Sequence, residues 1–217
     1  MCLEEVIEKE TCRFGTLSKR IGLKLLAYLI LPLYTLWFTA GYDWFQLNFS
    51  VIGYELGHRD AFLLWGILVG TYYWMSLRAV LRASKVLSGT IKKYRGTFSL
   101  ALCCDLFLLF CAVTTPYLPN EFPFKAFLHI VFSALSAVLL LTIMLSLTAV
   151  LAFGKENQPK FCAFFVICLF IAFISGILLI AAGIVSSALE IFFTLSTIWL
   201  SDQMLRALEK KPKKFSS

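Results

Sequence analysis

Six long apolar stretches fill most of this 217-residue chain. A helix needs about 20 residues to cross about 30 Å of hydrocarbon at 1.5 Å per residue, and each stretch meets or nearly meets that length. The strands of a membrane β-barrel would instead be alternating segments of about 10 residues. The pattern predicts an all-α, polytopic membrane protein with a six-helix transmembrane bundle. The predicted spans are 21–41, 61–81, 97–118, 124–153, 161–183 and 184–204.

The composition leaves no room for a separate soluble domain. Hydrophobic residues make up 59% of the chain and charged residues only 15%, whereas a soluble domain carries about 25% charge. We therefore predict three parts: a cytoplasmic N-terminal segment over 1–20, a membrane domain over 21–204, and a basic cytoplasmic tail over 205–217.

The chain has a net charge of +7. Its basic residues alternate along the sequence with the predicted spans and do not form one cluster of the kind that binds nucleic acid. Lys and Arg lie before the first span, after the sixth, and in alternate gaps between spans; the other gaps hold only Arg59 and Lys125. Basic residues are retained on the cytoplasmic side of membrane proteins. Both termini and the loop 82–96 are therefore predicted to be cytoplasmic, and no nucleic-acid partner is expected.

Cysteine and histidine usage argues against a disulfide framework or a metal centre. None of the seven cysteines falls in a predicted outer loop: Cys2 and Cys12 precede the first span and the others lie within spans. Zinc needs three or four ligands, and the chain has only two histidines, so carboxylates would have to complete the shell. We predict no metal and no cofactor.

Away from the span ends, three acidic or imidazole side chains fall inside predicted spans: Asp105, His129 and Glu190. A charge at the centre of a span costs about 2.5–3.5 kcal/mol or more, so such residues face the bundle interior and have partners. His129 and Glu190 lie at a similar depth, about 8–10 Å below the outer ends of their spans at 1.5 Å per residue. We expect a hydrogen bond between them, directly or through one water or hydroxyl. The pair could be a polar contact that holds two helices together, a binding site for a lipid head group, or a catalytic centre.

The first outer loop, between the first two spans, combines apolar and polar side chains. Its apolar residues predict that it packs over the bundle mouth rather than extending into solvent; they are Trp44, Phe45, Phe49, Val51 and Ile52. Its polar residues extend the candidate site. The candidate catalytic residues are His129, Glu190 and Ser50, and the candidate substrate-binding residues are Arg59, Asn48 and Asp43.

One family resemblance rests on three short motifs. The segment Asn48-Phe49-Ser50-Val51-Ile52-Gly53 resembles the SIS-x-x-G element before the second span of the DRAM-like superfamily, with Phe49 in place of an isoleucine and no proline just upstream. Leu128-His129 and Ala188-Leu189-Glu190 resemble its His in the fourth span and Glu in the sixth. That superfamily includes damage-regulated autophagy modulators, FGF-receptor-activating proteins and post-GPI-attachment remodelling proteins. The resemblance implies lipid handling in the plasma membrane or endomembranes, with Ser50, His129 and Glu190 in one cluster.

The sequence thus favours a lipid-related role, in which an outer-leaflet pocket binds or remodels a polar lipid head and membrane lipids are the partners. Whether the protein is an enzyme stays open. A structural or accessory membrane protein is the alternative, and it would show the polar residues closed on one another. A small-solute transporter is a second alternative, but the sequence has no evident inverted repeat or paired broken helices.

Overall fold

The computed structural model describes residues 20–154 and 159–209, without the side chains of 85–87. All regular structure in these ranges is helical. The first helix (Arg20–Phe38) contains a π-helical segment, η1, followed by α2. The elements in chain order are η1 (Leu26–Ile30), α2 (Leu31–Phe38), η2 (Val51–Glu55), α3 (Arg59–Leu87), α4 (Gly89–Thr114), α5 (Pro123–Phe153), α6 (Pro159–Ala182) and α7 (Ser187–Glu209).

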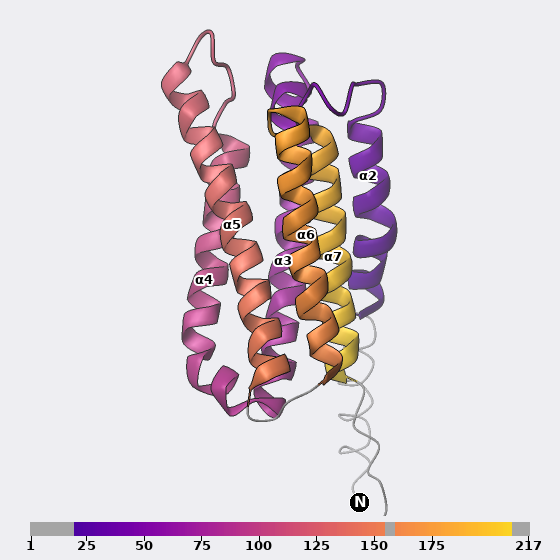
Figure 1. Ribbon diagram of the computed structural model, residues 1–217. Coiled ribbons are helices and arrows are strands. Elements are labelled where there is room, and N and C mark those ends of the chain that lie inside the picture. The colour runs from indigo at the N-terminus through magenta and orange to yellow at the C-terminus, as the bar shows by residue number, and fades with distance from the viewer. Residues whose placement is uncertain (1–19, 155–158, 210–217) are drawn as a thin grey trace, which may run out of the picture.

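The long helices run alternately up and down and form one bundle (Figure 1). Around the bundle, α3, α4, α5, α6 and α7 follow one another in chain order, each packed on the next, and α7 packs back on α3. The first helix lies outside this arrangement against α3 and α7. We call the end that holds the connections 39–58, 115–122 and 183–186 the loop end, and the opposite end, where the first helix begins and α7 ends, the basic end.

Within the described residues, four helices are long and apolar enough to cross a membrane: the first helix, α4, α5 and α6. The chain is therefore an all-helical protein with the character of a multi-pass integral membrane protein. The helices α3 and α7 occupy the second and sixth predicted spans but carry more polar and charged residues. Much of that polarity lies inside the bundle, since Ser76 on α3 and Thr197, Ser201 and Asp202 on α7 are buried.

The connection between the second and third apolar stretches differs from the sequence-based prediction. We expected a loop over 82–96, but α3 continues to Leu87 and α4 begins at Gly89, which leaves Ser88 as the only residue between them. Ser88 is extended and its hydroxyl accepts a hydrogen bond from the Ile91 N–H at 3.4 Å, as an N-cap. Lys and Arg are good helix formers, so the helices extend beyond the apolar runs.

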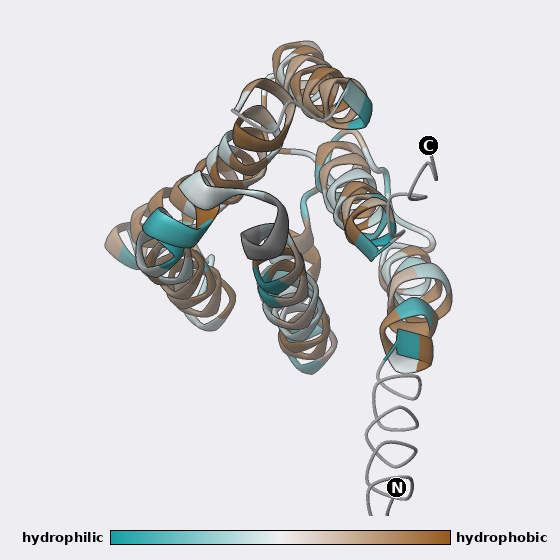
Figure 2. Cartoon of the chain, turned by 90° about the horizontal axis from the view of Figure 1, so that it is seen from below, coloured by the Kyte–Doolittle hydropathy of each residue, from teal (hydrophilic) through white to brown (hydrophobic). Residues whose placement is uncertain are grey.

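The apolar residues divide between the bundle interior and its outward faces. Phe38, Phe49, Phe62 and Trp65 pack ring on ring beneath the loop end, and all four are buried. By contrast, α6 buries only three side chains and leaves its other apolar residues exposed or half-buried. Figure 2, seen from the basic end, shows hydrophobic residues along the outer sides of the helices and hydrophilic ones near their ends. Outward apolar faces of this kind suit contact with lipid.

Candidate functional site

The first outer loop packs on the beginning of α7, which confirms the predicted placement over the bundle. The carbonyl oxygens of Leu47 and Trp44 accept hydrogen bonds from the N–H groups of Ser187 and Ala188 at 2.7 and 2.8 Å. These N–H groups lack partners within their own helix, so the loop satisfies them. Phe49 and Ile52 are fully buried, as predicted, whereas Trp44 and Phe45 are exposed.

Glu190 completes this attachment. Its Oε2 accepts a hydrogen bond from the Phe49 N–H at 2.7 Å, so a side chain on α7 holds the loop 141 residues earlier in the chain. Its position in the first turn of α7 also places acceptor oxygens at the helix end where backbone N–H groups lack partners within the helix.

Asn48 and Ser50 form a local contact within the loop. Asn48 Oδ1 accepts hydrogen bonds from the Val51 N–H and from the Ser50 hydroxyl, both at 2.8 Å. Asn48 therefore caps the short helical turn that contains η2. Ser50 is 4% exposed, and its hydroxyl proton is directed to Asn48 rather than to a histidine.

His129 lies in the second turn of α5 and contacts the first residue of the connection 115–122. Its Nδ1 is 3.0 Å from the Thr115 carbonyl oxygen, and because a carbonyl can only accept, Nδ1 carries the proton. The imidazole packs beside the rings of Phe62 and Tyr117, with centroids 6.4 and 5.5 Å away. Thus His129 ties α5 to the end of α4.

Among the described residues, no direct hydrogen bond joins His129 and Glu190, and the predicted link through one water stays a prediction. Each side chain has a different backbone partner, Thr115 for His129 and Phe49 for Glu190. The helix packing explains the separation, because α5 packs on α4 and α6 whereas α7 packs on α3 and α6. Equal depth in the membrane is therefore insufficient to bring two side chains together when their helices are not neighbours.

The other polar residues predicted at this end have local contacts. Asp43 Oδ1 accepts from the Phe45 N–H at 2.9 Å at the surface. Arg59 begins α3 close to the Tyr54 phenol, which donates to the Val113 carbonyl at 2.6 Å. Burial raises the pKa of Tyr54, and Arg59 acts against that shift. The structure thus gathers Asn48, Ser50 and Glu190 around the loop, with His129 in a separate contact.

Asp105, the third candidate residue inside a predicted span, joins α4 to α5. Its Oδ1 accepts a hydrogen bond from the Ser136 hydroxyl at 2.9 Å, and the Asp105 residue is 1% exposed. This is the interhelical contact expected of a polar side chain in a membrane bundle.

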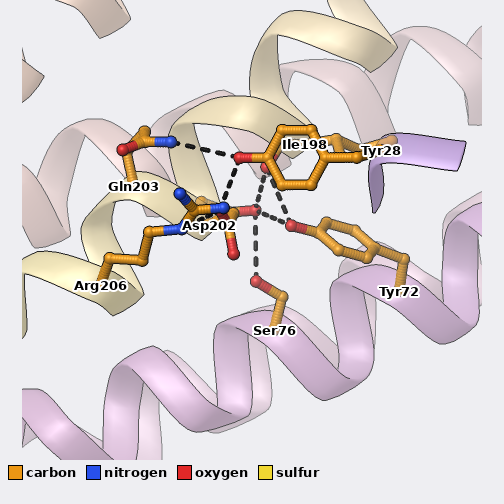
Figure 3. Close-up of polar contacts among 8 residues, drawn as sticks. Tyr28, Tyr72, Ser76, Ile198, Asp202, Gln203 and Arg206 are labelled. Carbon is orange, nitrogen blue, oxygen red and sulfur yellow. Dashed lines mark hydrogen bonds and ion pairs between the residues drawn. The ribbon is translucent and has the colours of Figure 1, made fainter. Parts of the chain in front are cut away.

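A second polar cluster lies near the basic end, among the first helix, α3 and α7 (Figure 3). The Tyr28 hydroxyl donates to Asp202 Oδ2 at 2.6 Å and accepts from Gln203 Nε2 at 3.2 Å. Arg206 Nε lies 2.7 Å from the same Asp202 oxygen, as an ion pair rather than a well-aligned hydrogen bond. Asp202 is thereby shared by two helices.

The cluster continues into the bundle through hydroxyl groups. The Tyr72 hydroxyl lies 2.9 Å from both the Ile198 carbonyl and the Ser201 hydroxyl, and Ser76 donates to Ser201 at 3.2 Å. These contacts fix α3 against α7 with side chains that are fully buried. One turn of α3 and α7 is therefore joined by a hydrogen-bonded network in place of apolar packing.

Sequence reasoning missed this second cluster because Asp202 falls in the last turn of the predicted sixth span. The candidate polar residues inside spans were only Asp105, His129 and Glu190, and Asp202 was left out. Two signals were available: Asp202 and Arg206 have the i,i+4 spacing of a helical ion pair, and Ser201 is four residues beyond Thr197, which extends the polar face of α7.

Comparison with known proteins adds no relative: no family model, curated protein or solved structure matches this chain. The resemblance to the DRAM-like superfamily therefore stays a prediction based on its short motifs.

Proposed function

We propose that this protein is a six-span membrane protein with a structural or accessory role, in which the polar residues of the loop end hold the bundle closed. The observation that carries the proposal is the separate engagement of Glu190, Ser50 and His129. Each is bound to a different partner: Phe49 N–H, Asn48 Oδ1 and the Thr115 carbonyl. Catalysis by the three together would need them within reach of one reacting atom.

A double-mutant cycle tests this role. We would compare Glu190→Ala, His129→Ala and the combined variant by thermal unfolding of the purified full chain in detergent. Independent structural contacts give effects that add to within about 0.5 kcal/mol, whereas residues of one site show coupling. Additive losses are expected; strong coupling would contradict the proposal and favour a joint site.

Lipid binding or remodelling at the loop end is the competing function. It requires the same side chains to exchange their protein contacts for contacts with a lipid head group. Mass spectrometry of lipids that copurify with the parent chain and the two single variants separates the alternatives. Unchanged lipid content in folded variants supports the structural role, and selective loss of one lipid class supports the lipid site.

The proposed topology places both termini and the basic end in the cytoplasm. Two exposed positions at opposite ends test it, Thr90 at the start of α4 and Asn120 in the second connection. We expect Asn120→Cys to react with an impermeant maleimide outside intact cells and Thr90→Cys to react only after permeabilisation. The parent chain, with its seven native cysteines, is the control for background labelling. Labelling of Thr90→Cys from outside would reverse the orientation.

A further inference from the structure

An open hollow of about 310 Å³ lies between α6 and α7 at the basic end. It is lined by Lys160, Phe164, Gln203, Arg206 and Ala207. A smaller hollow of about 60 Å³ lies on the side of the first helix and is also lined by Arg206. The larger hollow has two cations, one amide and one aromatic ring on its walls. None of these residues takes part in the contacts described at the loop end.

The two cations are held in place by the surrounding protein. Arg206 pairs with Asp202 through Nε, and its guanidinium carbon is 5.3 Å from the centre of the Tyr28 ring. Lys160 Nζ donates to the Ala207 carbonyl at 2.8 Å, which fixes its ammonium group beside the last turn of α7. Groups fixed in this way lose less conformational entropy when a ligand binds.

The charges around the hollow favour an anion. Asp202 is already engaged by Arg206 and Tyr28, and the nearby Glu209 is paired with Arg20 at 2.8 Å. The contacts of Lys160 are to a carbonyl oxygen and to the Phe161 ring, neither of which carries a full negative charge. The ion pair of Arg206 uses Nε, and a guanidinium has further N–H donors on its terminal nitrogens.

The hollow also adjoins apolar surface. Phe164 forms part of its wall, and Trp199, which is 41% exposed, lies four residues before Gln203 and therefore on the same face of α7. A ligand with a charged head and a hydrocarbon chain would meet cations at the basic end and apolar side chains farther along the helices.

We propose that this hollow binds the phosphate head group of an anionic phospholipid in the cytoplasmic leaflet. Lys160 and Arg206 contact the phosphate oxygens, the Gln203 amide adds a polar contact, and Phe164 and Trp199 lie beside the lipid chains. Asp202 and Tyr28 are positioning residues that hold Arg206 and Gln203. Basic pockets between helices on the cytoplasmic side have the chemistry for such head groups. The site is independent of the structural role proposed for the loop end.

Native mass spectrometry of the purified full chain with dioctanoyl phosphatidylglycerol tests the proposal. The site variant is Lys160→Gln with Arg206→Gln, and the matched control is Lys92→Gln with Lys93→Gln, which removes two exposed cations from α4. We expect the site variant to bind about thirtyfold more weakly, from about 1 kcal/mol for each basic residue near anionic lipid, and the control to remain within about twofold of the parent.

The same titration with dioctanoyl phosphatidylcholine and with inorganic phosphate identifies the ligand. Weak binding of both supports a site for an anionic lipid, and phosphate binding as tight as lipid binding overturns it. Equal losses in the site and control variants would show general charge attraction and also overturn it, as would unchanged binding in the site variant. Should the double variant fail to fold, Gln203→Leu keeps both cations; an intermediate loss of lipid binding supports the site and parent-like binding rejects it.

Discussion

The two ends of the bundle use polar side chains in different ways. At the loop end, Glu190 and His129 bind backbone groups of the two outer connections. At the basic end, Asp202 binds side chains from the first helix and from α7 itself. Contacts to backbone attach the connections to the helices. Contacts among long side chains join helices and also present Arg206 and Gln203 to a hollow, so at the basic end the residues that stabilise the bundle also line a surface open to a ligand.

The largest effect is expected at Asp202, because Asp202→Ala removes the acceptor of Tyr28 and the partner of Arg206 together. Loss of a buried ion-pair partner costs about 3–5 kcal/mol, and since the Arg206 side chain is 41% exposed we expect about 2–3 kcal/mol. Thermal unfolding of the full chain in detergent measures it. Gln203→Ala, which removes one hydrogen bond, is the control; equal losses in the two variants would show that Asp202 does not organise the cluster.

At the loop end, Glu190→Ala should destabilise the protein by about 2 kcal/mol, because the Phe49 N–H loses its acceptor. Glu190→Gln keeps an acceptor oxygen and should recover about half of the loss. The loop 39–58 should become sensitive to limited proteolysis in the Ala variant before the bundle unfolds. Equal cleavage of the parent and both variants would contradict the proposed attachment of the loop.

His129 should have a smaller effect, because it makes one hydrogen bond to a single carbonyl. His129→Phe keeps an aromatic ring beside Tyr117 and Phe62 but removes the donor to Thr115, which should cost about 1 kcal/mol. The thermal midpoint measures this loss. A loss as large as that of Asp202→Ala would indicate that His129 has a further partner at the loop end.

The smallest effects concern the capped turn in the first outer loop. Asn48→Ala removes the acceptor for both Val51 N–H and Ser50, and a lost N-cap costs about 1 kcal/mol. Ser50→Ala leaves the cap in place and should cost about 0.5 kcal/mol. Stability measurements on the two variants give the order; a larger loss for Ser50→Ala would mean that its hydroxyl has a role beyond the contact with Asn48.

The positions of the helices were largely predictable because a hydrocarbon environment requires long apolar runs with all backbone groups paired within the helix. The predicted stretch 124–153 matches α5 within one residue. The loop predicted over 82–96 was wrong because basic residues can continue a helix beyond its apolar part. Charge alone therefore marks where a helix leaves the apolar region but not where it ends.

The candidate site was predictable only in part. The sequence indicated that Asp105, His129 and Glu190 need partners, since an unpaired charge inside a span is costly, and the structure provides Ser136, Thr115 and Phe49. Two of these partners are backbone groups, which every residue possesses, so no sequence pattern distinguishes them.

By itself, the sequence determined that the chain is helical and has long membrane-compatible segments, because apolar length and helix propensity are local properties. Only the tertiary structure decided that α7 lies between α3 and α6, that Glu190 meets the first outer loop, and that Asp202 joins Tyr28 and Arg206. Those contacts depend on which helices are neighbours. Apolar faces that point outward are alike whichever helices are neighbours, so they do not determine the arrangement of the helices. That arrangement depends on how well many interior side chains fit together.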